Sequence, residues 1–304
     1  MLTKRTSKGL VWIDLESPTQ EELRTVEESY HLSPLVTHEL ASPTLKPKVD
    51  LYKEYIYLIL HFPRLRGNKG GPQNQEIDFV IGKKFLITVR YGGSETLHYF
   101  GKVFEAHAVL HKSDFGPHAG FIFFRLLQKL YEALGHEVEA TKETLQAIEE
   151  RIFNHEEREM VVVLSRVGRE MLTFRRALLQ HRTVVESFEV AGRRFFGEDF
   201  GFHLRTLVGD YYRVDNSVET GMAFMKELRE TNNSLVSTKQ NEIMKVLTIM
   251  AFVTFPLSLI ASIFGMNTSY TPLVGIHGDF WIIMGMMLLL TGVFFWFFKR
   301  KNWL

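Results

Sequence analysis

VLTIMAFVTFPLSLIASIF (residues 246–264) and FWIIMGMMLLLTGVFFWFF (residues 280–298) are two uncharged stretches near the C-terminus. At a rise of about 1.5 Å per residue, a helix of either length crosses a hydrocarbon core of roughly 30 Å. Core helices of soluble proteins are rarely this long without a charge, and two in succession are rarer. The sequence therefore predicts a transmembrane hairpin with helices at 246–266 and 280–298, joined by a loop at 267–279.

Basic residues flank the hairpin on its two outer sides. Lys239 and Lys245 precede the first span, and Lys299, Arg300 and Lys301 follow the second. Positive residues favour the cytoplasmic side, so we expect both chain ends in the cytoplasm and the loop outside it. The first eight residues hold no apolar segment of the kind that a signal peptide needs. We therefore expect a multi-pass protein of the inner (plasma) membrane.

Composition and motifs exclude several other classes. Lys and Arg number 36 against 35 Asp and Glu, so no basic excess predicts nucleic-acid binding, and the absence of Cys excludes disulfides and thiolate metal sites. No P-loop, G-x-S-x-G, H-E-x-x-H or glycine-rich nucleotide motif is present. The sequence predicts no enzyme.

The residues before the hairpin predict an α+β domain followed by long helices. Alternating and continuous apolar runs predict strands at 10–15, 55–60, 77–81 and 85–90, and Ser17–Glu22 reads as a helix start with Pro18 in its first turn. After Pro117 the pattern is helical, with a Gly-rich break at 192–201. We expect a domain at 1–117, a helical hairpin at 118–201, a stalk helix at 202–245 that continues into the first span, and a basic tail at 299–304.

Small, polar and apolar residues recur along the first span with the period of a helix seam. The spacing averages close to 3.5, which brings parallel helices face to face around an axis. The alternative is a lipid-embedded helix whose small residues serve tight packing. We call this set the pore stripe: Asn241, Met244, Leu247, Ala251, Phe255, Ser258 and Ser262.

Gly265-Met266-Asn267 stands at the outer end of the first span. Mg²⁺ prefers oxygen ligands in octahedral geometry and gives up its water reluctantly. A ring of neutral carbonyl and amide oxygens could hydrogen-bond a hydrated Mg²⁺ and still release it. The tripeptide occurs by chance in many proteins, but this position in a C-terminal hairpin makes it specific.

With these features the sequence resembles the CorA magnesium and cobalt transporters, in which a Gly-Met-Asn signature ends the first of two C-terminal spans. The resemblance extends upstream over nearly the whole chain. It is carried by the segments Ser33-Pro34-Leu35, Lys46-Pro47-Lys48, Leu172–Arg176, Val218-Glu219-Thr220, Asn241–Thr248 and Lys299–Leu304.

The resemblance implies a funnel-shaped homopentamer in the lipid bilayer that imports Mg²⁺, or Co²⁺ or Ni²⁺, down the membrane potential. It implies a selectivity filter at Gly265, Met266 and Asn267, hydrophobic rings at Met244, Leu247 and Phe255, and a basic ring at Lys299, Arg300 and Lys301. It also implies gating by intracellular Mg²⁺, held by acids at the positions of Glu39 and Glu230, although each is equally well explained as a solvated surface acid.

Two alternatives stay open. A Zn²⁺ transporter of the same superfamily has the same hairpin, although neutral oxygens disfavour tight Zn²⁺ binding. A membrane-anchored coiled-coil scaffold leaves the pore stripe and the Gly-Met-Asn position unexplained. The sequence also departs from the family's pattern, because Asp279 is the only acid of the loop and Phe255 is bulkier than the Met that is frequent there.

Overall fold

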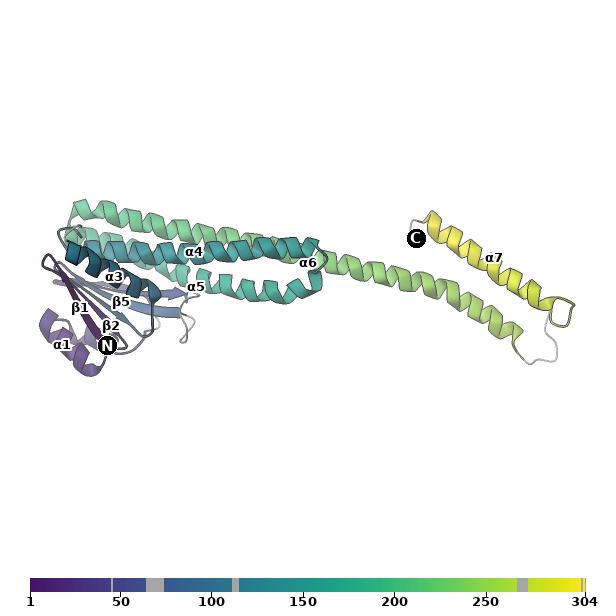
Figure 1. The fold of residues 1–304 in the computed structure, drawn as a ribbon, viewed down its shortest axis with the longest axis horizontal. Helices are drawn as coiled ribbons and strands as arrows, with labels where there is room; N and C mark the ends of the chain where they lie inside the picture. The colour runs from purple at the N-terminus through teal and green to yellow at the C-terminus, as the bar shows by residue number, and fades with distance from the viewer. Residues whose placement is uncertain (45, 64–73, 111–114, 267–272, 302, 304) are drawn as a thin grey trace. The chain divides into compact units, whose positions relative to one another are not determined.

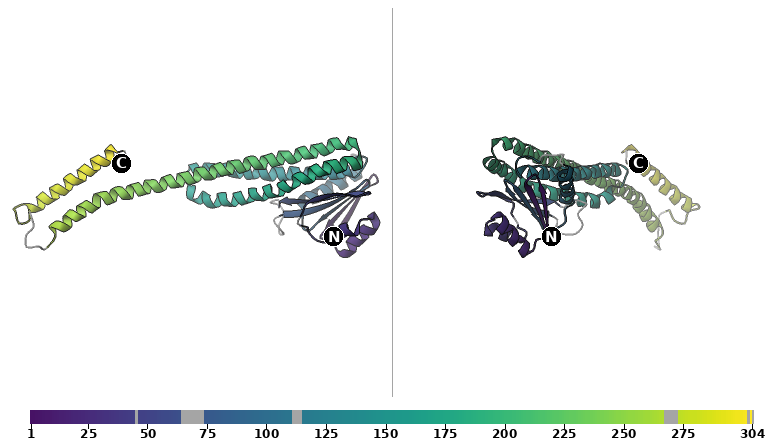
Figure 2. Two further views of the ribbon diagram at one scale, coloured as in Figure 1. Left: turned by 180° about the vertical axis from the view of Figure 1, so that it is seen from behind. Right: turned by 60° about the vertical axis from the view of Figure 1, so that its left-hand side comes forward.

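The computed structural model describes residues 1–44, 46–63, 74–110, 115–266, 273–301 and 303. The chain divides into two compact units, Met1–Arg229 and Glu230–Leu304. Their boundary falls inside the stretch 202–245 that we expect to form the stalk. Figure 1 and Figure 2 show the elements of each unit from three sides.

A six-stranded mixed sheet forms the base of the first unit. Its strand order is β1-β2-β6-β5-β4-β3, and every neighbouring pair is antiparallel except β2 and β6. Parallel pairing of β2 with β6 places Ile13 beside Ile87 across 74 positions of sequence. The strands are β1 (Leu2–Ser7), β2 (Leu10–Glu16), β3 (Lys48–Leu51), β4 (Tyr55–Pro63), β5 (Asn74–Gly82) and β6 (Phe85–Arg90).

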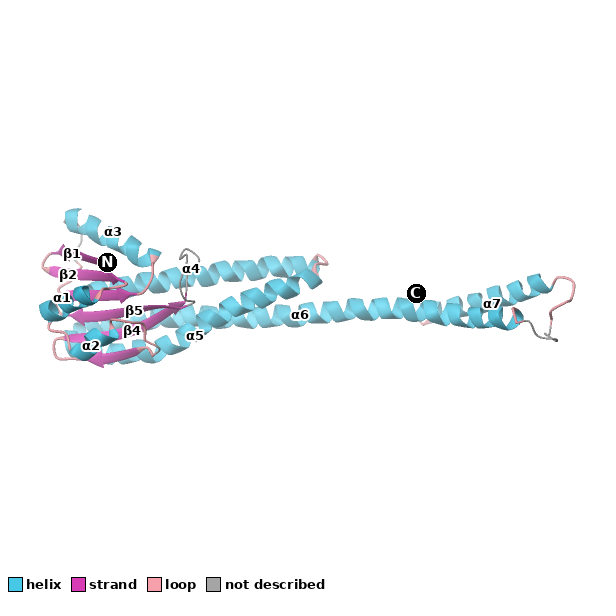
Figure 3. Cartoon of the chain, turned by 90° about the horizontal axis from the view of Figure 1, so that it is seen from below, coloured by secondary structure: helices cyan, strands magenta, loops and turns pink. Residues whose placement is uncertain are grey.

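Helices cover both faces of this sheet, and the alternation of side chains along each strand decides which residues each face receives. Ile13 and Leu15 of β2 point toward α1 (Gln20–Tyr30) and α2 (Pro34–Glu39), where they join one apolar cluster. Trp12 points to the other face, and its ring lies 5.7 Å from that of Phe104 in α3 (Glu95–Leu110). Figure 3 shows α1 and α2 on one side of the sheet.

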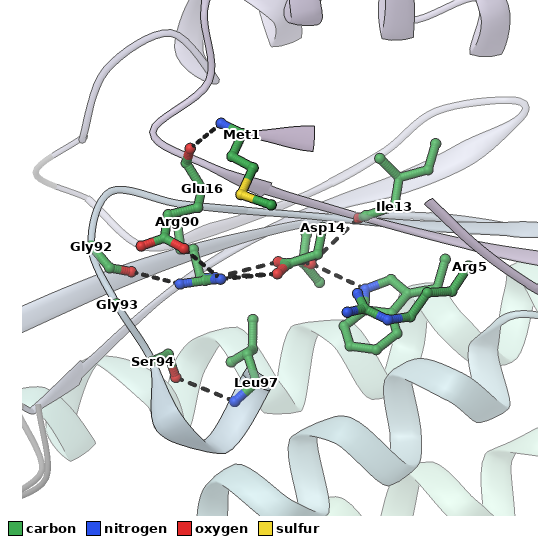
Figure 4. A network of polar contacts seen from close by, with 12 residues as sticks. Met1, Arg5, Ile13, Asp14, Glu16, Arg90, Gly92, Gly93, Ser94 and Leu97 are labelled. Carbon is green, nitrogen blue, oxygen red and sulfur yellow. Dashed lines mark hydrogen bonds and ion pairs between the residues drawn. The ribbon is translucent and has the colours of Figure 1, made fainter. Parts of the chain in front are cut away.

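A buried polar network joins β2 to β6 within this core (Figure 4). The Arg90 guanidinium lies 3.1 Å from an Asp14 carboxylate oxygen, and the Thr88 hydroxyl donates to the same carboxylate at 2.7 Å. The Trp12 indole N–H in turn donates to the Thr88 oxygen at 3.1 Å. Because each buried polar group has a partner, the network fixes the register of the parallel pair at little desolvation cost.

Three long helices complete the first unit and carry the chain into the second. His181, fully buried on α5, receives a hydrogen bond from the Tyr131 hydroxyl of α4 at 3.1 Å, and its other ring nitrogen lies 2.9 Å from the His61 carbonyl oxygen of β4. These bonds tie the helices to the sheet. The helices are α4 (Gly120–Phe153), α5 (Glu157–Phe196) and α6 (Glu198–Phe264).

The second unit contains the last part of α6 and the helix α7 (Asp279–Arg300), which turn the chain into a helical hairpin (Figure 1). Both helices contain stretches long and apolar enough to cross a membrane. The α+β fold class and the two C-terminal apolar helices expected from the sequence are confirmed.

Some local expectations were wrong or incomplete. The helix α1 is capped by Thr19, whose hydroxyl accepts from the Glu22 N–H while the Glu22 carboxylate accepts from the Thr19 N–H. Pro18 therefore precedes the helix rather than lying in its first turn, because this reciprocal capping box satisfies two otherwise unpaired donors. The sequence reading also missed β1, β3, α2 and α3.

Candidate ion pathway and regulatory residues

The residues of the first span differ in how far they are exposed. At about 100° per residue, the pore stripe lies on one side of the helix. The two helices meet where the ring of Phe252 on α6 lies 6.5 Å from that of Phe298 on α7. Ile249 is buried, and the partly exposed residues of the span are Thr248, Ala251, Val253, Pro256, Leu257, Ile260 and Phe264.

Six of the seven side chains of the pore stripe are exposed in the single chain, and Ala251 is partly exposed. Met244 is 59% exposed, Leu247 is 54% exposed and Phe255 is 73% exposed. Nearby hydroxyls are satisfied within the helix, since Thr248 and Thr254 donate to the carbonyl oxygens of Met244 and Met250. An exposed stripe of apolar and small polar side chains is what a helix needs to meet copies of itself around an axis.

The outer end of α6 is shaped by Gly265. Its N–H donates to the Ala261 carbonyl oxygen at 2.9 Å, and a Cβ at this position would lie 3.0 Å from the same oxygen. A side chain here would therefore press on the Ala261 carbonyl and require the helix end to shift by a few tenths of an ångström. Met266 follows and is exposed. Asn267, the predicted filter residue, lies outside the described residues.

The basic tail begins at the other end of the hairpin. Phe298 of α7 is buried, and its ring lies 6.5 Å from that of Phe252 on α6. The chain then turns back, because the Trp303 N–H donates to the Phe298 carbonyl oxygen at 3.0 Å and the two rings stack. Lys299, Arg300 and Lys301 are all exposed.

The two acids expected to bind regulatory Mg²⁺ lie in different units. Glu39 is the last residue of α2, and its carboxylate lies 2.8 Å from the Lys48 ammonium of β3. Lys48 also lies 2.7 Å from Asp50. Glu230 lies on α6 and is exposed. Within the described part of the chain no group of three or more His, Cys, Asp or Glu residues is placed to hold a metal, so neither acid has a complete ligand set in one chain.

Sequence reasoning missed a buried acid pair that lies next to Glu39. Glu76 and Asp78 lie two positions apart on β5, so their side chains share one face of the sheet, and both are buried. The Tyr91 hydroxyl lies 3.2 Å from an Asp78 carboxylate oxygen and 3.4 Å from the Glu39 carbonyl oxygen. Burial and the neighbouring Glu76 carboxylate raise the pKa of Asp78 well above its usual range. Two acids at positions i and i+2 of an apolar strand were the available signal.

The fold and this arrangement define a class: an α+β domain followed by a long helix that runs into a two-span hairpin. The chain matches the model of the family described as CorA-like Mg²⁺ transporter protein over residues 7–300, and it belongs to that family. It is a divalent cation transporter of the CorA family, and its two apolar helices are membrane spans.

Individual relatives agree over almost the full length. The chain is 22% identical over 309 residues to the cobalt/magnesium transport protein CorA of Thermotoga maritima, covering 100% of this chain and 86% of the relative. Its fold matches the complete structure of the CorA magnesium transporter from Methanocaldococcus jannaschii with a TM-score of 0.78 at 20% identity, covering 97% and 92% of the two chains. The ZntB cytoplasmic domain from Vibrio parahaemolyticus shares the fold over 76% of this chain, with a TM-score of 0.59 at 12% identity.

Proposed function

We propose that this protein is a homopentameric channel that admits Mg²⁺, and with it Co²⁺ or Ni²⁺, to the cytoplasm down the membrane potential. The observation that carries the proposal is the exposed pore stripe of α6, which leads in the sequence to Gly265-Met266-Asn267. In the proposed pentamer five copies of α6 surround the axis with this stripe inward, and five copies of α7 lie outside them. Relatives named as magnesium and cobalt transport proteins support the choice of ions.

The pathway follows from the residues along the stripe. Asn267 and the carbonyls of Gly265 and Met266 form the outer ring, which hydrogen-bonds the hydrated ion and leaves its first water shell in place. Asn241 lines the pore before the three apolar rings, Ala251 lies between the second and the third, and Ser258 and Ser262 follow them toward the filter. Those rings, at Met244, Leu247 and Phe255, close the pore by excluding water.

The driving force needs no nucleotide. A unit charge that crosses 100 mV gains roughly 2.3 kcal/mol, so a divalent cation gains about twice that amount on entering a negative interior. Lys301 of the basic tail sets the electrostatic barrier at the inner mouth.

Regulation by intracellular Mg²⁺ is the second part of the proposal. Glu39 of one subunit and Glu230 of a neighbour bridge a Mg²⁺ ion that holds the subunits in a symmetric, closed arrangement. Glu39 already pairs with Lys48 at 2.8 Å, so the divalent ion competes with an ammonium for this carboxylate. Loss of Mg²⁺ frees the stalk helices and opens the pore.

The experiment is ion uptake into proteoliposomes that hold the full chain, with Mg²⁺ and Zn²⁺ compared at an imposed negative potential. Mg²⁺ should enter with the wild type, and Asn267→Ala should reduce uptake to the level of protein-free liposomes. Asn216→Ala, at an exposed Asn of α6 in the first unit, is the matched control and should leave uptake unchanged.

Three results would count against the proposal. Unchanged uptake in Asn267→Ala would remove the selectivity filter from this position. Zn²⁺ entry driven by a pH gradient, with little Mg²⁺ flux, would make the protein a zinc transporter of the same superfamily. No flux of any divalent ion would favour a membrane-anchored scaffold.

A further inference from the structure

The basic residues at the end of α7 do not share one side of the helix. Phe298 faces α6, where it is buried. At about 100° per residue, Trp296 lies on the opposite side, and Lys299 and Arg300 lie within about 60° of Trp296. Lys301 is rotated about 140° from Trp296 and so returns toward the side of α6.

Side-chain contacts agree with this division. The Arg300 guanidinium lies 5.5 Å from the centre of the Trp296 ring, which is 62% exposed. Trp303, in contrast, stacks on the buried Phe298 with 6.0 Å between ring centres. Trp303 thus packs against the hairpin, whereas the Trp296 and Arg300 pair lies on the other side of α7.

The outer side of α7 meets the bilayer if the channel is arranged as proposed above, and the present inference rests on that arrangement. In the proposed channel α6 surrounds the axis and α7 lies outside it, so the side of α7 opposite Phe298 is the periphery of the oligomer. Leu289 and Val293 are exposed on this side, and a Cβ at Gly292 would have no neighbour within 4 Å. Because Gly292 has no side chain, the surface of α7 has open space about one turn before Trp296, where an acyl chain can lie.

We propose that Lys299, Arg300 and Trp296 form a binding site for the phosphate headgroup of an anionic phospholipid, and that Lys301 does not take part. Arginine binds phosphate oxygens in two-pronged geometry, and lysine adds a point charge. Tryptophan favours the headgroup level of a membrane. The acyl chain of the same lipid lies over Gly292 beside Leu289.

The test is quenching of tryptophan fluorescence in the full chain reconstituted with brominated phosphatidylglycerol or brominated phosphatidylcholine. The signal of Trp296 is the difference between wild type and Trp296→Phe. Each basic residue near the headgroups should raise the preference for phosphatidylglycerol about fivefold. Lys299→Gln with Arg300→Gln should abolish this preference, Lys299→Arg should keep it, and Lys301→Gln is the matched control that should also keep it.

Several outcomes would overturn the site. Equal quenching of Trp296 by the two lipids, or an equal loss of preference in Lys301→Gln, would remove headgroup recognition from Lys299 and Arg300. Loss of the preference on addition of inorganic phosphate would show a free-anion site instead. Absence of quenching by either lipid would show that this side of α7 does not face the bilayer. The quenching measurements do not depend on ion flux. The lipid site can therefore be refuted while Asn267→Ala still abolishes Mg²⁺ uptake, and the channel can be refuted while the lipid preference is still observed.

Discussion

Replacing Asp14 by Leu should strongly destabilise the first unit, because it leaves the Arg90 guanidinium buried without its main partner. The side chains of Asp14 and Arg90 are 8% and 7% exposed, so solvent gives little compensation. Removing one member of such a pair costs about 3–5 kcal/mol. Arg90 keeps a contact of 2.9 Å to Glu16, whose side chain is 41% exposed. We therefore expect the lower value, about 3 kcal/mol.

Thermal denaturation of the purified protein, followed by the fluorescence of Trp12, measures this loss directly. Trp12 is fully buried in the first unit and donates to Thr88 inside the same network. For a folding unit of this size each kcal/mol corresponds to about 2–4 °C, so the Tm should fall by about 6–12 °C.

The control replaces both partners. Asp14→Leu combined with Arg90→Met leaves no unpaired charge, and buried ion pairs exchanged for apolar side chains often lose little stability. The double variant should therefore recover most of the lost Tm. A fall of less than about 2 °C in the single variant, or a double variant that melts below it, would refute the reasoning.

Three further predictions concern pH and the pore. Burial lowers the pKa of His181 to about 4, below the 6.5 of the unfolded chain, so its contribution to stability is complete above pH 6.5 and is lost as the pH falls toward 4. The free energy of unfolding should drop by about 3 kcal/mol over this range, and His181→Gln, which can keep both hydrogen bonds, should flatten the drop in a pH series of melts. Gly265→Ala should reduce Mg²⁺ uptake because its Cβ would lie 3.0 Å from the Ala261 carbonyl oxygen, and unaltered flux would show that the helix end yields freely. Phe255→Met should raise the rate of Mg²⁺ uptake, because a smaller and more flexible side chain widens the proposed apolar ring. A lower rate would show that Phe255 does not narrow the pore.

The long elements were predictable because their patterns repeat many times. The absence of charge in 246–264 and 280–298 indicated two spans, and the strands β2, β4, β5 and β6 followed from runs of apolar residues. β1 was missed because Leu2–Ser7 is largely polar and lies at the edge of the sheet, where only one neighbour covers it. Its assignment depends on pairing with β2, which the local sequence does not contain.

In the candidate site, too, some features could be predicted from local sequence and others could not. The pore stripe stays a prediction from its period, and the structure adds that six of its seven side chains are exposed in the single chain. Contacts between distant residues could not be predicted. The pairing of Glu39 with Lys48 depends on how α2 meets β3, and the bridge from Tyr91 to Asp78 depends on the register of β5 and β6. Lys299 and Arg300 lie on one side of α7, and Lys301 is rotated toward the other side. This difference follows from the rotation of about 100° per residue and is not visible in a run of adjacent Lys and Arg residues.

The division of the chain into two units has a consequence for synthesis. The unit Met1–Arg229 contains the whole sheet, including the parallel partners β2 and β6, and it precedes both membrane spans in the chain. Domains generally fold in order as they leave the ribosome, at about 5–20 residues per second. The sheet therefore has its complete set of strands before the first span is translated, and the final quarter of the chain takes about 4–15 seconds more. The first unit can therefore complete its sheet before the residues of the two membrane spans are synthesised.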